Sequence, residues 1–352
     1  MNIISSDQIH VLGVDGGGTS TVADLADIAG RTLGRGRAGA SNAKAVGLEA
    51  AERALVEAIS GAFAQAGLER RVVAAVCLGP AGFDRPEDRQ ILEQWNQEHQ
   101  WGENLILRND GELVIAAGIP SGSGIGVIAG TGSIAVGILR DESGRVLKRT
   151  RAGGWGHVLG DEGSAYGVAV AALRLTARRG DGRSPIPSGG DPLTNRILNA
   201  LGIDQPSGMI GRVYGGDLDR SAIAALAPEV VAAVEDGDEA AGREILDRAG
   251  IDLAETAFAV AANLGLIDRS RFVVDPDRNN INTNIKTHQS ATPLALAGGF
   301  LLSTPRVRRA LIDRLAELGL AVDPREVPEP VVGAVRIALE AIDPSRSNFK
   351  KS

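Results

Sequence analysis

Short apolar runs and glycine breaks alternate at the start of the chain. Residues 9–14 form an apolar run that stops at the sequence DGGGT, residues 15–19, which predicts a strand ending in a glycine turn. Residues 21–28 and 32–35 lie on either side of Gly30, and we expect two antiparallel strands joined by a tight turn there. The chain is therefore predicted to open with a strand followed by a hairpin.

A helix and two further strands are expected next. Apolar residues recur at spacings of three and four between residues 48 and 63, which indicates an amphipathic helix, and Gly67 stands where such a helix usually ends. Residues 72–78 are continuously apolar, as is typical of a strand buried on both faces. Residues 105–107 predict another short strand, which ends near Asp110.

The pattern of a strand ending in a glycine loop occurs a second time. Residues 125–129 are apolar and are broken by the sequence GTGS, residues 130–133. Residues 134–139 and 146–149 then flank a DESG turn, which predicts a β-hairpin. The two glycine loops lie about 115 residues apart, and the repeated order of elements indicates an internal duplication.

The second half of the chain is rich in alanine. We expect a strand at residues 294–297 that runs into Gly298 and Gly299. We also expect several helices, at residues 164–179, 220–234, 238–264, 305–318 and 331–342. Residues 275–290 are polar and longer than an ordinary connection. The pattern predicts an α/β protein of two lobes with a cleft between them. The first lobe would comprise residues 1–117 and a C-terminal helix at 331–346, and the second residues 118–330.

Composition narrows the class of protein. A length of 352 residues suits two domains, and a net charge of −7 without a block of Lys or Arg argues against nucleic-acid binding. No apolar run approaches the ~20 residues that span a bilayer, and the N-terminus lacks the features of a signal peptide, so we expect a cytoplasmic protein. The only cysteine, Cys77, excludes a disulfide framework or a four-thiolate metal site within one chain and is expected to be buried and inert. The 46 glycines indicate many tight loops.

Each glycine loop is compatible with phosphate binding or with a simple turn. In the first glycine loop, the residues Gly16, Gly17, Gly18 and Thr19, backbone N–H groups can turn toward a phosphate, and Asp15 can orient Mg²⁺ beside it. The second glycine loop repeats the pattern with Gly130, Thr131, Gly132 and Ser133. The first glycine loop lacks the Gly-Lys-Ser/Thr of a Walker motif and is followed by a strand, whereas a dinucleotide-binding fingerprint is followed by a helix.

Three other positions are compatible with more than one function. Asp110 at the end of a strand can point into a ligand crevice and take a proton from a hydroxyl, or it can cap a helix. Asp161 can bind sugar hydroxyls or act as a helix cap. Gly298 and Gly299 can support a nucleoside base or form the turn that starts a helix.

The motifs together resemble a known family. Their order covers GVDGGGT at residues 13–19, Ser41 and Asn42, the second glycine loop, the block GGWGHVLGDEGSAY at 153–166, and LAGG at 296–299. The chain resembles the N-acetylglucosamine kinase group of the family that includes the benzoyl-CoA reductase-activating ATPases. This family belongs to the superfamily of sugar kinases, heat-shock chaperones and actin. The match covers roughly residues 9 to 345.

The resemblance implies two ribonuclease-H-like, actin-like ATPase lobes that close over ATP–Mg²⁺ and an amino sugar. It places both glycine loops on the phosphates, Gly298 and Gly299 against adenosine, and Asp15 near the metal. Asp110 would be the base for the C6 hydroxyl, and Asn42, Thr131 and Asp161 would hold sugar hydroxyls. A homodimer is common in this group. Two departures are Gly111, where alanine is more usual in the vertebrate-type enzymes, and the inserted residues 275–290.

Other functions of the same fold stay open at this point. The 2-substituent of the sugar is not readable, so glucosamine is an alternative to N-acetylglucosamine. A reductase-activating ATPase would need cysteines for a [4Fe–4S] cluster shared by two subunits, and Cys77 lies within a predicted strand. A sugar-sensing protein without catalysis is a third possibility, against which the presence of Asp110 argues.

Overall fold

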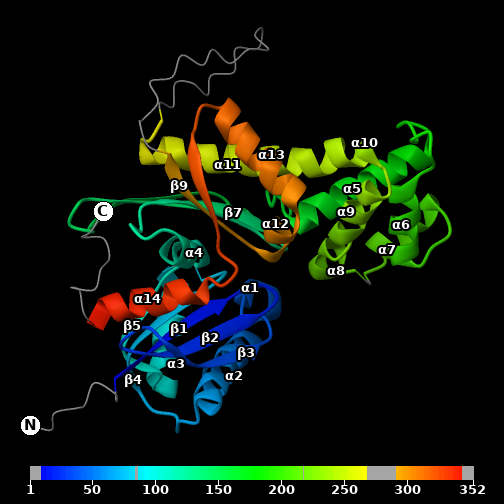
Figure 1. The fold of residues 1–352 in the computed structure, drawn as a ribbon. Helices are drawn as coiled ribbons and strands as arrows, with labels where there is room; N and C mark the ends of the chain where they lie inside the picture. The colour runs from blue at the N-terminus through cyan, green and yellow to red at the C-terminus, as the bar shows by residue number, and fades with distance from the viewer. Residues whose placement is uncertain (1–8, 84–85, 217, 268–290, 343–352) are drawn as a thin grey trace, which may run out of the picture. The chain divides into compact units, whose positions relative to one another are not determined.

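The computed structural model describes residues 9–83, 86–216, 218–267 and 291–342 (Figure 1). The polar segment 275–290 and residues 343–346 of the expected last helix lie outside the described residues. The chain divides into two compact units. Unit 1 comprises Met1–Gly126, Gly137–Arg149 and Arg325–Ser352, and unit 2 comprises Val127–Val136 and Thr150–Pro324.

Unit 1 is built on a mixed five-stranded sheet. Its strands and helices are β1 (His10–Gly16), β2 (Thr21–Asp27), β3 (Thr32–Ala38), α1 (Ala43–Val46), α2 (Leu48–Ala66), β4 (Val73–Pro80), α3 (Pro86–His99), β5 (Gly102–Leu107), α4 (Asp110–Gly118) and α14 (Val331–Ile342). The strand order is β3-β2-β1-β4-β5; β1, β2 and β3 pair antiparallel, whereas β1, β4 and β5 pair parallel. The predicted opening strand and hairpin are confirmed.

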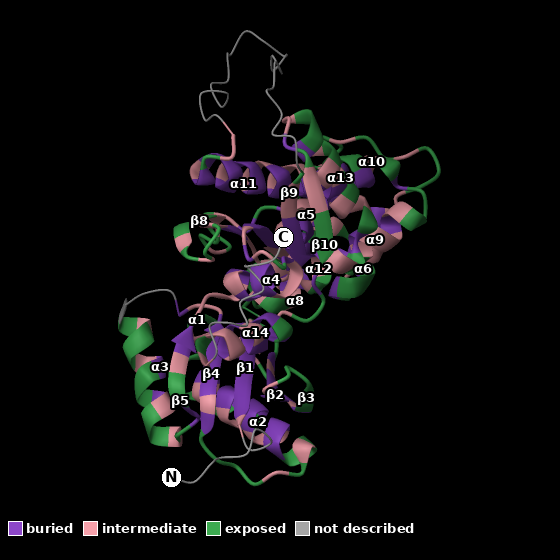
Figure 2. Cartoon of the chain, turned by 60° about the vertical axis from the view of Figure 1, so that its left-hand side comes forward, coloured by how far each residue is buried: buried purple, intermediate pink, exposed green. Residues whose placement is uncertain are grey.

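Both faces of this sheet are covered by helices. Alternate residues of β4 enter two different cores, Val76 and Leu78 with α2 and α3, and Ala75 and Cys77 with α4 and α14. Strand β4 is therefore buried on both sides (mostly purple in Figure 2), as the continuous apolar run at 72–78 predicts. Each buried aliphatic side chain contributes about 1.5–3 kcal/mol to folding.

The close packing of α2 on the sheet depends on glycine. A Cβ atom at Gly36 in β3 would lie 2.6 Å from the backbone nitrogen of Ala62 and closer still to the carbonyl oxygen of Ala58. Gly34 in the same strand meets α2 in the same way, at Ala66. These two glycines thus serve helix–sheet packing and have no part in a ligand loop.

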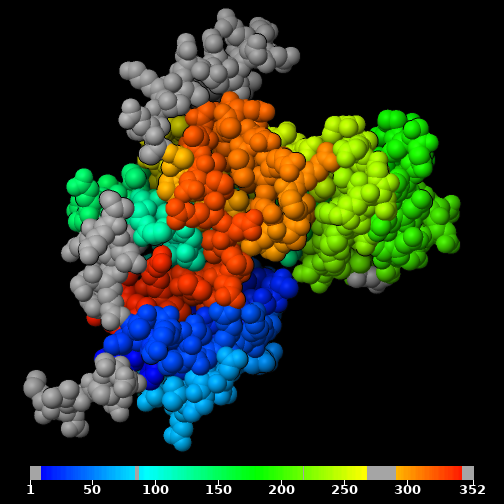
Figure 3. All heavy atoms as spheres, in the orientation of Figure 1, coloured from blue at the N-terminus to red at the C-terminus, as the bar shows by residue number. Residues whose placement is uncertain are grey.

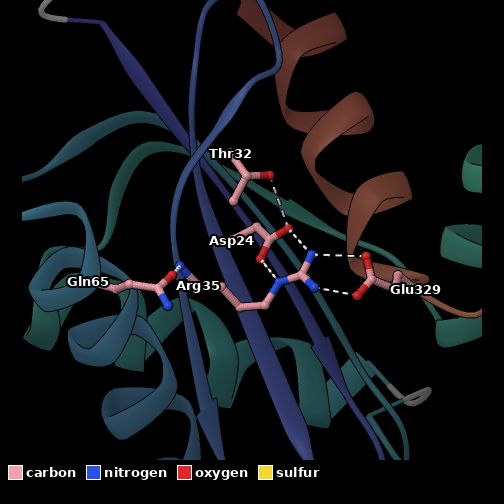
Figure 4. Close-up of polar contacts among 5 residues, drawn as sticks. All are labelled: Asp24, Thr32, Arg35, Gln65 and Glu329. Carbon is pink, nitrogen blue, oxygen red and sulfur yellow. Dashed lines mark hydrogen bonds and ion pairs between the residues drawn. The ribbon is translucent and has the colours of Figure 1, made fainter.

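A network of ion pairs links the β2–β3 hairpin to the segment before α14 (Figure 4). The fully buried carboxylate of Asp24 accepts two hydrogen bonds of 2.7 Å from the guanidinium of Arg35, which also pairs with Glu329. A buried charge is tolerated when it is paired and hydrogen-bonded. The exposed pair with Glu329 adds little by itself, and the C-terminal segment is part of unit 1 chiefly because α14 packs in the core of that unit.

The second sheet has the same strand order as the first. The remaining elements are β6 (Gly124–Ala129), β7 (Ser133–Arg140), β8 (Val146–Gly153), α5 (Ala165–Gly180), α6 (Pro192–Leu201), α7 (Met209–Tyr214), α8 (Arg220–Ala224), α9 (Ala227–Glu235), α10 (Glu239–Ala241), α11 (Arg248–Leu264), β9 (Thr292–Ala297), α12 (Gly299–Ser303), α13 (Pro305–Glu317) and β10 (Val322–Glu326). The order of the second sheet is β10-β9-β6-β7-β8, which is β8-β7-β6-β9-β10 when read from the other end. The strands β6 to β10, taken in chain order, therefore occupy the same positions in their sheet as β1 to β5 do in the first. This correspondence agrees with the predicted duplication.

Unit 2 departs from the sequence expectations in its helices. The helix expected at 220–234 is divided into α8 and α9, because Pro228 in the first turn of α9 has no N–H with which to continue a helix. The helix expected at 238–264 begins as α10, passes through a π-helical turn at Gly242–Asp247 and continues as α11. Helix α6 of unit 2 was not expected, and neither was α3 of unit 1. The helices from α5 to α10 are drawn in green to yellow-green in Figure 3.

Gly36→Ala is expected to destabilise unit 1 by about 1–3 kcal/mol, because the added methyl group would push α2 away from β3. Urea unfolding of the full chain would measure the loss. Gly39→Ala is the matched control, since a Cβ atom at Gly39 would meet nothing within 4 Å. Equal stability of the two variants would contradict this account of the packing.

Candidate active site

The first group of candidate residues lies where the parallel strands of unit 1 end. Asp15 and Gly16 are the last residues of β1 and pair with Gly79 and Pro80 at the end of β4. Asp110 follows the neighbouring strand β5 and begins α4. The carboxyl ends of parallel strands meet at one edge of a sheet, which is where open α/β sheets bind their ligands.

The first glycine loop is a closed turn that leaves two N–H groups available. The Gly17 N–H donates to the carbonyl oxygen of Ser20 at 2.8 Å, which closes the turn between β1 and β2. Within the described residues, the N–H groups of Gly18 and Thr19 make no backbone hydrogen bond, and a Cβ atom at Gly18 would meet nothing within 4 Å. The loop is therefore a tight turn and can also offer N–H donors to a phosphate, so the two interpretations open from the sequence do not exclude each other. Gly16 is required because a side chain there would overlap the Ser41 hydroxyl.

Asp110 is not the capping residue of α4. Asn109 occupies the N-cap position, and its side chain accepts a hydrogen bond of 2.8 Å from the Glu112 N–H. The Asp110 carboxylate accepts from the Gly111 N–H at 2.8 Å and lies close enough to Asp15 to influence it electrostatically. The helix-capping function that the sequence left open for Asp110 is thus performed by Asn109, and proton transfer is the function that stays open for Asp110.

The pKa of Asp15 lies near neutral pH, where the protonated and ionised forms of its carboxyl group coexist. Burial raises the pKa of Asp15 from 3.8 to about 7, and the negative charge of Asp110 contributes to the rise. A divalent cation would offset both effects, and carboxylate oxygens are the ligands that Mg²⁺ prefers. The residues at this edge therefore fit an Mg²⁺ ion bound by Asp15.

Asn42 lies beside the first glycine loop. The N–H of Ser41 donates to the carbonyl oxygen of Gly17 at 3.2 Å, which fixes the segment next to the loop. The Asn42 side chain caps α1 by accepting from the Lys44 N–H at 3.1 Å. Gly82, with φ of +88°, makes room for this side chain, because a Cβ atom there would clash with Asn42 Oδ1.

The second glycine loop in unit 2 repeats the design of the first. The Gly130 N–H donates to the carbonyl oxygen of Gly132 at 2.9 Å, whereas the N–H groups of Thr131 and Gly132 make no backbone hydrogen bond among the residues described. The next N–H, that of Ser133, donates to Asp161 Oδ1 at 3.1 Å. This loop is therefore also a turn with two available N–H groups, and Asp161 is attached to it directly.

Asp161 is buried and strained. Only 3% of it is exposed, and its φ of +63° lies in the left-handed region that residues with a side chain seldom adopt. Its second oxygen, Oδ2, forms an ion pair of 2.7 Å with Arg220 Nη2. Sequence reasoning missed Arg220 because it lies 59 residues further along the chain, at the start of α8, in no recognisable motif.

Gly298 and Gly299 have separate functions. Gly298 has φ of +95° and is packed so closely on Ala129 that a Cβ atom would lie 2.5 Å from its carbonyl carbon. It caps α12, whose first residue is Gly299, and a Cβ atom at Gly299 would meet nothing within 4 Å. The pair is thus a helix-start turn next to the second glycine loop, with open backbone at Gly299.

Asp110→Asn is expected to lower the pKa of Asp15 below 7 while leaving it above 3.8, because the like charge disappears and the larger effect of burial stays. Asp15 keeps its proton up to about pH 7 in the folded protein but only up to about pH 4 in the unfolded chain. The free energy of unfolding therefore falls as the pH rises from about 4 to about 7. The variant should weaken that loss of stability.

A ¹³C-carboxyl NMR titration of aspartate-labelled protein would measure the pKa of Asp15. Glu57→Gln, which removes an exposed carboxylate on α2, is the control and should leave the pKa unchanged. An identical Asp15 pKa in the wild type and in Asp110→Asn would contradict the proposed coupling.

Two characterised relatives and one solved structure resemble the chain. An N-acetylmuramic acid/N-acetylglucosamine kinase from Clostridium acetobutylicum is 31% identical over 288 residues, which cover 78% of this chain and 91% of the relative. An N-acetyl-D-glucosamine kinase from Dictyostelium discoideum is 30% identical, over 74% and 82% of the two chains. A candidate N-acetylglucosamine kinase from Chromobacterium violaceum superposes with a TM-score of 0.66 at 28% identity and covers 94% of this chain and 99% of that one.

The family and fold expected from the motifs are confirmed. The two mixed sheets with flanking helices and the superposition agree with the two-lobed α/β fold. In the part of the chain that the structure describes, no helix is long and apolar enough to cross a membrane. The profile of the BadF/BadG/BcrA/BcrD ATPase family matches residues 12–338, nearly the whole chain, and the protein therefore belongs to that family.

Proposed function

We propose that the protein is an ATP-dependent kinase that transfers the γ-phosphoryl group of ATP to the 6-hydroxyl of an amino sugar, with N-acetylglucosamine as the first candidate. The observation that carries the proposal is Asp110, a carboxylate at the strand edge beside Asp15 that is not needed as a helix cap. The names of the two characterised relatives, both of which act on N-acetylglucosamine, support it.

In this proposal the two glycine loops bind the phosphates of one ATP. The available N–H groups of Gly18, Thr19, Thr131 and Gly132 would donate to phosphate oxygens, and the open backbone at Gly299, with Gly298, would lie against the adenosine. Asp15 would hold Mg²⁺, directly or through water; the bound ion neutralises charge on the transferred phosphoryl group. Protonation of Asp15 below about pH 7 would weaken this interaction.

Asp110 acts in the proposal as the general base. It would accept the proton of the C6 hydroxyl as that oxygen attacks the γ-phosphorus, while Asn42, Thr131 and Asp161 hold other hydroxyls of the sugar. Because Asn42 and Asp161 are already fixed by hydrogen bonds within their own units, they lose little freedom when they bind. Most of the rate enhancement would come from this alignment.

The alternatives differ in how well they suit the structure. Cys77 is fully buried in β4, and burial raises the pKa of its thiol to about 12, so it is unsuited to ligate a cluster shared between subunits. This disfavours the reductase-activating ATPase. Free glucosamine is a second acceptor within the proposed class. We also propose that the kinase is cytoplasmic and acts as a homodimer, as the resemblance implies.

A coupled assay of ATP consumption would test the function. The purified chain with Mg²⁺ is screened against N-acetylglucosamine, glucosamine, glucose and N-acetylmuramic acid. We expect turnover stimulated by at least one amino sugar. The absence of sugar-stimulated turnover with every acceptor would contradict the kinase and favour the ATPase or the sugar-sensing protein.

Asp110→Asn is expected to lower sugar-dependent turnover by ~10²–10⁴-fold, the usual contribution of a positioned base. Nucleotide binding, measured by calorimetry with a non-hydrolysable analogue, should stay within a few-fold of the wild type. Glu57→Gln serves again as the exposed control. A variant that retains more than about a tenth of wild-type turnover would rule out the base role.

A further inference from the structure

Asp161 is shared between the second glycine loop and a distant arginine. One carboxylate oxygen accepts the Ser133 N–H at 3.1 Å, and the other pairs with Arg220 Nη2 at 2.7 Å. The backbone carbonyl of the same residue accepts from the Ser164 hydroxyl at 2.6 Å. The carboxylate therefore connects the loop to α8.

The local geometry leaves Asp161 little freedom. A side chain at Gly132 would lie 2.7 Å from Asp161 Oδ1 and closer still to Arg220 Nη2, so both groups pack directly on the loop backbone. The residue keeps a left-handed φ of +63°, which is unfavourable unless surrounding contacts impose it. The contacts with Ser133, Ser164 and Arg220 are those that impose it here.

The guanidinium of Arg220 is the positive charge that compensates this buried carboxylate. A buried carboxylate is costly unless it is paired and hydrogen-bonded, and the loop supplies only one neutral N–H donor. Arg220 is itself anchored, because it is the first residue of α8 and Asp219 caps that helix by accepting from the Ala222 N–H at 2.7 Å. The charge is therefore presented from a fixed backbone position.

We propose that Arg220 is a positioning residue for the kinase reaction: it holds the Asp161 carboxylate in place against the second glycine loop, so that one carboxylate sets both the loop conformation and the sugar contact. The proposal rests on the proposed function for the roles of Asp161 and the loop. It predicts that sugar and nucleotide binding both depend on Arg220, through its contact with Asp161 and with the backbone of the second glycine loop.

The test compares Arg220→Met, Arg220→Lys and Arg174→Met in the full chain. Arg174 is an exposed arginine of α5 in the same unit and is the matched control. For Arg220→Met we expect the KM values for sugar and for ATP to rise together by about tenfold or more, since a buried carboxylate loses its partner. Arg220→Lys keeps the charge without the planar fork and should recover part of the loss. Added guanidinium should improve Arg220→Met and leave Arg174→Met unaffected.

A merely structural role gives a different pattern. If Arg220 only stabilised the fold, the variant would lose active protein and melt earlier, but its KM values would equal those of the wild type, and this result would overturn the proposal. Should Arg220→Met fail to fold, Arg220→Lys decides in the same way, by raised KM values or by unchanged ones.

A second readout separates this inference from the proposed function. In ¹⁵N-serine-labelled protein without ligands, Arg220→Met should shift the Ser133 amide resonance, and so should Asp161→Asn, whereas Arg174→Met should not. An unmoved Ser133 resonance would overturn the inference even in an active kinase. A wild-type protein without sugar-stimulated turnover would overturn the proposed function, while the resonance would still report on the contact.

Discussion

Two carboxylates of like charge lie at one edge of the sheet in unit 1, and the proposed chemistry depends on that placement. Asp15 and Asp110 are brought together because β1, β4 and β5 run parallel and end at the same edge. The sheet can hold them there because helices cover both of its faces, so the strand ends are fixed by the two cores. The raised pKa of Asp15 reflects its burial first and the negative charge of Asp110 second. Such a site suits a ligand that supplies positive charge, as Mg²⁺ with ATP would.

Unit 2 also places an acidic residue next to a glycine loop, but it compensates the charge of that residue differently. Its glycine loop is closed by one internal hydrogen bond, like that of unit 1, and leaves two N–H groups available. Its acidic residue, Asp161, is balanced within the protein by Arg220, whereas Asp15 faces another acid. Two sheets with the same strand order thus hold two kinds of carboxylate, one next to another acid and one paired with an arginine. The duplicated sheets supply the loops, and the residues around each loop decide its charge.

Much of the architecture was readable from the sequence, because its elements carry strong local signals. The continuous apolar run of β4, the amphipathic stripe of α2 with Gly67 as its left-handed C-cap, and the bounds of α14 all follow from periodicity and capping. Helix α3 was missed because its sequence is mostly polar, and the division between α8 and α9 depends on one proline. The function of Asp110 was ambiguous because an aspartate and its neighbour Asn109 can both cap a helix. Arg220 gave no signal, since its importance arises from tertiary contact alone.

The central claim is phosphoryl transfer to the 6-hydroxyl of an amino sugar, and the position of the phosphate on the product tests it most directly. The protein is incubated with ATP, Mg²⁺ and N-acetylglucosamine or glucosamine, and the product is analysed by ³¹P–¹H correlation NMR. The account predicts a phosphate ester whose phosphorus couples to the two protons on C6. Coupling to the anomeric proton, or inorganic phosphate as the only new phosphorus species besides ADP, would contradict it.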